Sequence, residues 1–161
     1  MFHQGIWYLA WDMRYNAQRI DTTIKVAAEF MESARDNLNA SSPRLRPFIE
    51  NLFGAVELLA KAVLLILPDK KVLRGKTHGL IKSNFNKWSN LGNIDSDFAN
   101  LLNELERMRD PARYGLEPWE LPVEEAQSLL ARPRKCGPRL RLAHRAEART
   151  KAQRVCADKL R

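Results

Sequence analysis

Apolar residues recur every three or four positions through much of the chain, which is the spacing that places them on one face of an α-helix. The first run extends from about Met13 to Leu38 and predicts a long amphipathic helix. A second run, from about Pro43 to Leu67, is apolar on most sides in its later half. Because a helix of this kind contacts several neighbours, we expect the second helix to form the centre of the core.

Three shorter helices are predicted further along the chain. One extends from about His78 to Trp88, and the next begins where Asp95 or Ser96 can accept a hydrogen bond from a free amide of the first turn. Pro111 should kink or end this helix, because proline has no amide proton and disfavours a helical conformation in the residue before it. The last helix spans about Pro122 to Arg132. Proline is favoured at the first position of a helix, where its missing amide proton is not needed.

The fold class follows from what this pattern contains and lacks. The 161 residues include no clear alternating strand, internal repeat or glycine-rich phosphate loop, and their number is typical of one domain. We therefore predict an all-α, antiparallel up-and-down bundle of four to five helices within residues 15–131. Residues 1–14 form an aromatic N-terminal segment, and residues 132–161 form a separate tail. The aromatic side chains of the first segment are expected to fill a core edge or a dimer interface.

Charge is distributed unevenly between the predicted bundle and the tail. The chain has a net charge of +8, but residues 132–161 contain eight arginines and three lysines against two acidic residues, so the bundle itself is close to neutral. A basic tail attracts any polyanion by releasing counterions, without sequence preference. We interpret the tail as a solvated or disordered extension. Its abrupt change in composition fits either a genuine basic tail or a shifted reading frame.

Several classes of protein are disfavoured by composition. The two cysteines, Cys136 and Cys156, have no partners at zinc-ligand spacing, so we predict neither a metal site nor a disulfide framework, and no cofactor. The N-terminus lacks the features of a signal peptide. The most apolar stretch, Ala55–Leu67, contains two charged residues and is shorter than the roughly 20 residues of a membrane span. These features predict a cytoplasmic protein without a membrane segment.

The stretch RMRDPARYG, residues 107–115, carries the most concentrated candidate chemistry. It brings three arginines, one aspartate and one tyrosine to the end of an amphipathic helix, where Gly115 and Pro118 stop the helical pattern. One interpretation is structural, because Glu106 and Arg109, and likewise Asp110 and Tyr114, have the spacing of helical surface pairs. The other interpretation is a site that binds an anion.

The order of features resembles the HEPN family of small helical bundles. The resemblance covers roughly residues 15 to 130 and rests on "NLFGAVELLAKAVLLI" in the second helix, "THGLI" after the following loop, and "LERMRDPARYG" at the end of the fourth helix. It implies an antiparallel bundle that dimerises. In the catalytic branch of the family it also implies a metal-independent ribonuclease, whose motif is Arg, a polar residue, three further residues and His.

The motif is incomplete in this chain. Arg109 corresponds to the arginine and Asp110 to the polar residue, but Tyr114 stands where the histidine should be. Cleavage of RNA through the 2′-hydroxyl needs a proton acceptor near neutral pH, and tyrosine, with a pKa near 10, is a poor one. His78 is the alternative base, although its place at the start of a helix favours a capping or packing role. His144 also follows an arginine by five positions, but lies outside the family region and is rejected.

The catalytic residues are therefore left unassigned, with Arg109, Asp110, Tyr114 and His78 as candidates. Candidate ligand-binding residues are Arg109, Arg113, Tyr114 and Lys61, although Glu57 and Lys61 also have the spacing of a helical ion pair.

Three functions remain open at the level of sequence. The first is a homodimeric HEPN-like module that binds nucleotide or RNA without efficient catalysis, for which the resemblance also implies a possible nucleotidyltransferase-like antitoxin partner. The second is a metal-independent ribonuclease toxin, and the third is a helical bundle for protein interaction. The absence of the motif's histidine favours the first, a binding module rather than an enzyme.

Overall fold

The computed structural model describes residues 2–66, 77–93, 95–115 and 118–133, with side chains from Asn16 onward. This part of the chain contains helices and no strand, which confirms the all-α prediction. The labelled helices are α1 (Phe2–Asn39), α2 (Leu45–Leu64), α4 (His78–Asn90) and α5 (Ser96–Tyr114). A further helix covers residues 123–133. No described helix has the length and apolar character needed to cross a membrane.

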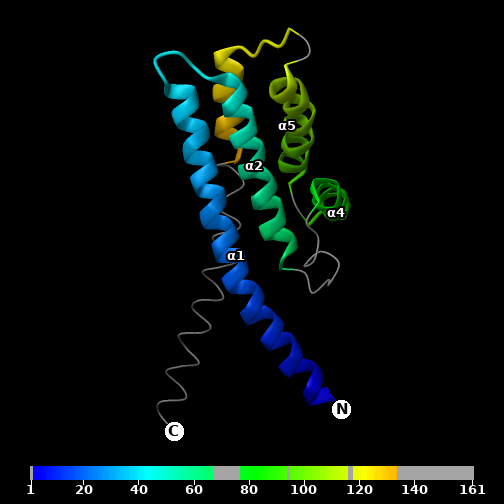
Figure 1. Cartoon of the computed structure of the whole chain (residues 1–161). Coiled ribbons are helices and arrows are strands. Elements are labelled where there is room, and N and C mark those ends of the chain that lie inside the picture. Colours follow the sequence, from blue (N-terminus) through cyan, green and yellow to red (C-terminus); the bar gives the residue numbers. More distant parts are fainter. Residues whose placement is uncertain (1, 67–76, 94, 116–117, 134–161) are drawn as a thin grey trace.

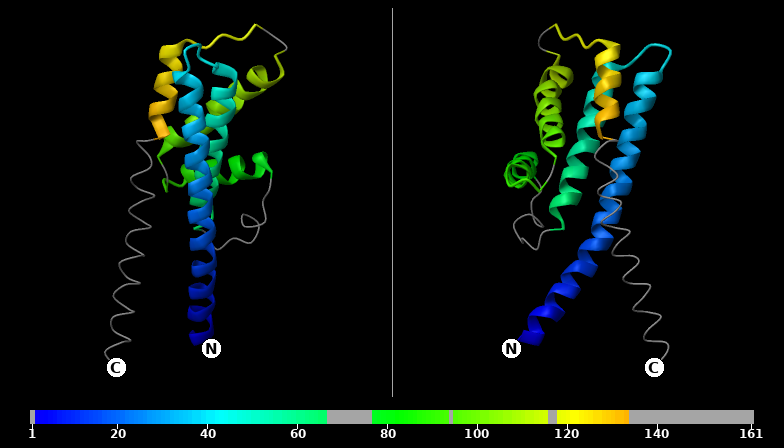
Figure 2. Two further views of the ribbon diagram at one scale, coloured as in Figure 1. Left: turned by 60° about the vertical axis from the view of Figure 1, so that its left-hand side comes forward. Right: turned by 180° about the vertical axis from the view of Figure 1, so that it is seen from behind.

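The helix α2 occupies the middle of the bundle, as its apolar sequence predicts. It lies between α1 and α5, antiparallel to α1, and the 123–133 helix lies at the same end of the bundle as the α1–α2 turn (Figures 1 and 2). In Figure 1, α4 is seen end-on while its neighbours are seen from the side, so α4 lies across the bundle. One helix therefore departs from the simple up-and-down arrangement that the sequence predicts.

The core forms around one stripe of α2. Its side chains recur at helical spacing and are almost completely removed from solvent. The stripe consists of Phe48, Ile49, Leu52, Phe53, Val56, Ala60 and Leu64. Gly54 faces α1 closely, because a Cβ atom there would lie 3.2 Å from Cδ1 of Phe30. Helices α4 and α5 each add an aromatic ring to the core. The rings of Phe85 and Phe98 meet edge to face, with their centroids 5.4 Å apart.

Helix ends agree with the sequence at some positions and differ at others. Asp95 caps α5 as predicted, since its Oδ1 accepts a hydrogen bond of 3.1 Å from the backbone amide of Asp97. The α1 helix begins at Phe2 rather than near Met13. The cap of α2 is Arg44, which makes no side-chain capping bond.

Of the two effects predicted for Pro111, a kink or an end of the helix, the end does not occur at this residue. The helix continues to Tyr114 and stops at Gly115, which has a left-handed φ of +62° and donates its amide proton to the carbonyl of Pro111. Proline fixes φ at a value close to that of a helix, so Pro111 removes one backbone donor and still lies within the last turn of α5. Glycine then provides the stop, because it adopts positive φ without steric penalty.

Some sequence predictions concern residues outside the described ranges. They include Cys136, Cys156, His144 and the tail after residue 133, together with the side chains of the N-terminal aromatic residues.

Candidate functional site at the end of α5

The arginine of the incomplete motif faces into the bundle. The Nε atom of Arg109 lies 3.4 Å from Oε2 of Glu50 on α2, and its Cζ atom lies 4.9 Å from the centre of the Phe53 ring. Its side chain is only 18% exposed. The guanidinium charge is therefore balanced inside the protein, by a carboxylate and by the face of an aromatic ring.

One face of α2 provides the partners of both His78 and Arg109. Arg46, Glu50, Phe53 and Glu57 follow one another at steps of four, three and four residues, so they share one side of the helix. Three ion pairs join helices here: Glu50 with Arg109, Glu57 with His78, and Lys82 with Glu106. We call these six residues the polar seam: Glu50, Glu57, His78, Lys82, Glu106 and Arg109.

His78 connects α4 to this face of α2. Its Nδ1 atom contacts Oε1 of Glu57, whose side chain is 11% exposed, and its ring lies 5.8 Å from the ring of Phe53. The capping residue of α4 is Thr77, so of the two structural roles expected for His78, capping or packing, the contact with Phe53 supports packing. His78 and Arg109 both contact Phe53, which shows that the structure brings these two sequence candidates to one aromatic ring.

A shallow depression lies beside this ring, between α2, α4 and α5. It is lined by Phe53, Glu57, His78, Lys82, Leu102 and Glu106. Each basic side chain in the depression already has a carboxylate partner. Among the described residues, no group of three or more His, Cys, Asp or Glu side chains could hold a metal ion.

Two local ion pairs expected from sequence are replaced by contacts between helices. Glu57 and Lys61 are four residues apart on α2, but Glu57 pairs with His78, and no ion pair of Lys61 is found within the described part of the chain. Glu106 and Arg109 likewise have separate partners on α4 and α2. The half-buried Lys61 therefore stays a candidate for ligand binding that no contact yet supports.

The remaining motif residues point away from the seam. Asp110, Arg113 and Tyr114 are exposed, and Tyr114 is 63% exposed. The guanidinium carbon of Arg113 lies 5.8 Å from the centre of the Tyr114 ring. The structure thus separates the motif into a half-buried arginine and an exposed arginine–tyrosine pair.

Arg46 holds the end of α5, and the sequence analysis missed it. Its Nη1 atom donates hydrogen bonds to the carbonyl oxygens of Pro111 at 3.0 Å and Ala112 at 2.9 Å. Its Cζ atom also lies 5.5 Å from the centre of the Trp119 ring. A cation is favoured at a helix C-terminus, where carbonyl groups lack helical partners. No local signal could have revealed this contact, because 65 residues separate Arg46 from Pro111.

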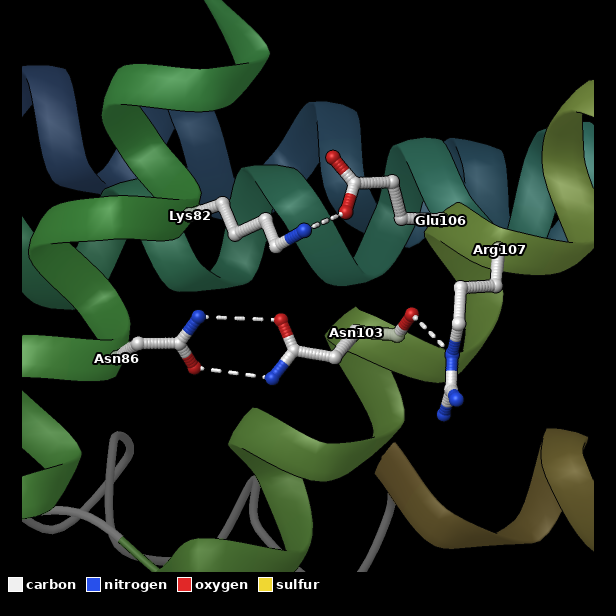
Figure 3. Close-up of polar contacts among 5 residues, drawn as sticks. All are labelled: Lys82, Asn86, Asn103, Glu106 and Arg107. Atoms are coloured by element: carbon white, nitrogen blue, oxygen red, sulfur yellow. Dashed lines mark hydrogen bonds and ion pairs between the residues drawn. The ribbon is translucent and has the colours of Figure 1, made fainter.

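A pair of asparagines joins α4 to α5 beside the seam. Asn86 and Asn103 exchange two hydrogen bonds, of 3.1 and 3.0 Å, in a closed amide pair (Figure 3). On the same α5 turn, Nε of Arg107 donates to the backbone carbonyl of Asn103 at 3.4 Å. Figure 3 shows the ion pair of Lys82 and Glu106 above the amide pair, and Arg107 beside Asn103.

Comparison with known families agrees with this arrangement. The profile of the HEPN domain matches residues 20–135, which include α2, α4, α5 and the 123–133 helix. The chain belongs to the HEPN domain family. No curated protein and no solved structure gives a significant match. Membership in the family makes this domain a helical module of the kind associated with nucleotides and RNA.

Proposed function

We propose that this HEPN domain binds nucleotide or RNA at the end of α5, without efficient catalysis. One observation carries the proposal: Arg109 is held by Glu50 and Phe53, while the position of the expected base carries an exposed tyrosine. In this chain Arg109 serves the contact between α2 and α5.

The chemistry of RNA cleavage supports this choice. A metal-independent reaction requires a base for the 2′-hydroxyl and a cation for the charge that develops on phosphorus. The charge of Arg109 is already balanced by Glu50, so less of it is available to a phosphate. Tyr114 places a phenol where the motif has an imidazole, the group that most often acts as a general base. Both requirements are therefore poorly met at the motif.

Arg113 and Tyr114 have the chemistry of a binding site instead. An exposed guanidinium contacts phosphate oxygens, and an exposed phenol ring stacks on a base. Among the described residues, Arg113 has no ion-pair partner that would compete with a phosphate. In this proposal Arg109 positions α5 and Arg113 contacts the ligand.

The test measures binding and cleavage together in the full chain. Fluorescently labelled RNA is incubated with the protein and a chelator, binding is followed by anisotropy, and cleavage is followed on a denaturing gel. We expect binding without cleavage, and weaker binding for the Arg113→Ala, Tyr114→Ala double variant. Lys25→Ala controls for the loss of a positive charge elsewhere, because Lys25 is 72% exposed on α1, on the other side of α2, where it pairs with Asp21. Efficient cleavage that is lost in Arg109→Ala would refute the proposal.

The basic tail needs its own control, because it attracts polyanions by itself. A chain that ends at Lys135 keeps the whole region matched by the HEPN profile. We expect this chain to keep the part of RNA binding that depends on Arg113 and Tyr114. If all RNA binding disappears with the tail, the site at the end of α5 is excluded.

A ribonuclease remains the second candidate because of the Glu57–His78 pair. Glu57 contacts Nδ1 of His78, which leaves Nε2 as the second nitrogen of a ring that is 55% exposed. A carboxylate that orients an imidazole in this way is a common arrangement for a general base. Chelator-resistant cleavage that is abolished by His78→Gln, and kept in Tyr114→Phe, would favour this candidate.

We also propose a homodimer and a nucleotidyltransferase-like antitoxin partner, both on the strength of family membership alone. Light scattering of the purified chain tests the first, with twice the monomer mass of 18.6 kDa as the expected result. Co-expression with a candidate nucleotidyltransferase-like protein, followed by co-purification and growth measurements, tests the second. A monomeric protein, or a chain without effect on growth, would remove the corresponding part of the proposal.

A further inference from the structure

We infer that the solvent-facing side of α5 is a binding site for single-stranded RNA, formed by the half-buried Asn103 and the exposed Arg107 and Tyr114. We call these three residues the outer row. The inference rests on the proposed function, since it names the class of RNA that the site takes and extends the site two turns beyond the motif.

The first step is the pairing of cations on α5. The helix contains three arginines, and Arg109 is the one that forms an ion pair within the described part of the chain. Arg107 and Arg113 are exposed and have no carboxylate within ion-pair distance there. The basic side chains of the polar seam, in contrast, are all neutralised by glutamates. The cations available to an external phosphate on α5 are thus those outside the seam.

The second step is the alignment of the outer row. Asn103, Arg107 and Tyr114 are four and seven residues apart, so they lie on one side of the helix. At a rise of about 1.5 Å per residue they extend over about 17 Å. This length is several times the roughly 3.4 Å between stacked nucleotides. A mononucleotide can contact one end of the row, whereas an oligonucleotide can contact all of it.

The third step is the chemistry that each position offers. Arg107 uses Nε to contact the carbonyl of Asn103, which fixes its stem and leaves the terminal nitrogens of the guanidinium for a phosphate (Figure 3). The closed pair of Asn86 and Asn103 leaves each amide one N–H donor and further acceptor capacity for the edge of a base. Tyr114 is 63% exposed and presents a ring for stacking.

The fourth step is the choice of a single strand. The bases of duplex RNA are stacked on one another, and their edges lie in a deep major groove that side chains cannot read. An aromatic ring and free amide edges on a convex helix suit bases that are already unstacked. Asp110 lies on the same exposed side, between Arg107 and Tyr114 in the sequence, and repels phosphate there. This charge favours a base rather than a phosphate beside Tyr114.

The experiment compares two labelled RNAs of equal length, an unstructured strand and a duplex, with the full chain over a series of salt concentrations. We expect Arg107→Ala to weaken binding of the single strand several-fold, and to reduce the slope of log K against log salt by about 0.7, the effect of one lost phosphate contact. Tyr114→Ala should weaken binding about tenfold, and Tyr114→Phe should restore most of it. Lys25→Ala on α1 controls for the loss of one positive charge.

The outcomes separate this inference from the proposed function. Equal affinity of Arg107→Ala and Lys25→Ala, or tighter binding of the duplex than of the single strand, would overturn the outer row. If Arg113→Ala still weakens binding in that case, the proposed function stands without it. An absence of RNA binding by the intact chain would overturn both.

Discussion

Arg107 and Arg109 are two residues apart on α5 and have opposite surroundings. Arg109 faces α2, where it pairs with Glu50 and contacts the ring of Phe53. Arg107 faces solvent, and its Nε donates a hydrogen bond to a backbone carbonyl of its own helix. A shift of two positions rotates a helical side chain by more than half a turn, so identical residues acquire different roles.

This contrast indicates where binding energy is available. An ion pair that joins two helices stabilises the fold only while both partners stay together, and a ligand that recruits one partner must break it. An exposed arginine can contact a phosphate without that cost. The polar seam therefore suits the assembly of α2, α4 and α5, and the outer row suits recognition.

The strongest test of the contrast is Arg109→Ala. It leaves the carboxylate of Glu50 without its cation, in a residue whose Oε1 atom is already buried without a hydrogen-bond partner. We expect a loss of about 2 to 3 kcal/mol in the free energy of unfolding. Urea denaturation followed by circular dichroism measures this change. A loss below about 0.5 kcal/mol, typical of a surface pair, would show that the seam does not stabilise the fold.

Arg46→Ala is expected to have the next largest effect. It removes two hydrogen bonds to carbonyls at the end of α5 and the contact with Trp119, at a cost of about 1 to 2 kcal/mol. Arg46→Lys should recover part of this stability, because it keeps the charge at the helix end. Thermal unfolding of the two variants gives the comparison. Equal melting temperatures for both variants and the unchanged protein would contradict the capping role.

The amide pair gives a smaller and more specific effect. Either Asn86→Ala or Asn103→Ala leaves the other amide without its partner, and we expect each to cost about 1 kcal/mol of stability. The double variant should cost less than the sum of the two. A double-mutant cycle measured by urea denaturation yields this coupling. Fully additive losses would mean that the two amides act independently.

The smallest expected effect concerns Asp110, which shares the exposed side of α5 with the outer row. Asp110→Asn removes a negative charge near Arg107 and Tyr114, so single-stranded RNA should bind about twofold more tightly at low salt. Anisotropy titrations at two salt concentrations measure the change. An increase that persists unchanged at high salt would point to a cause other than charge.

The sequence predicts the helices well because their signals are local. The apolar spacing identifies the central α2, and the cap at Asp95 and the stop at Gly115 are both found in the structure. The position of Pro111 predicts the wrong end for α5. A proline in the last turn of a helix removes one backbone hydrogen bond, and α5 continues past it to Tyr114.

The candidate site is predicted less completely, because its partners are distant in the sequence. The pair of Glu57 and His78 spans 21 residues and that of Arg109 and Glu50 spans 59. Only the positions and rotations of α2, α4 and α5 in the bundle bring such residues together. Sequence spacing instead favours neighbours on one helix, such as Glu57 with Lys61, which is why it selects the wrong partners.

The ion pairs between helices also have a consequence for how this chain can diverge. A substitution in Glu50 or Arg109 alone leaves a charged group unmatched, so a tolerated change requires a second change on another helix. Arg107 and Tyr114 form no ion pair within the described structure, so each can be substituted without a matching change on another helix. We expect relatives of this chain to show correlated substitutions along the seam, and independent ones on the exposed face that could tune ligand preference without cost to the fold.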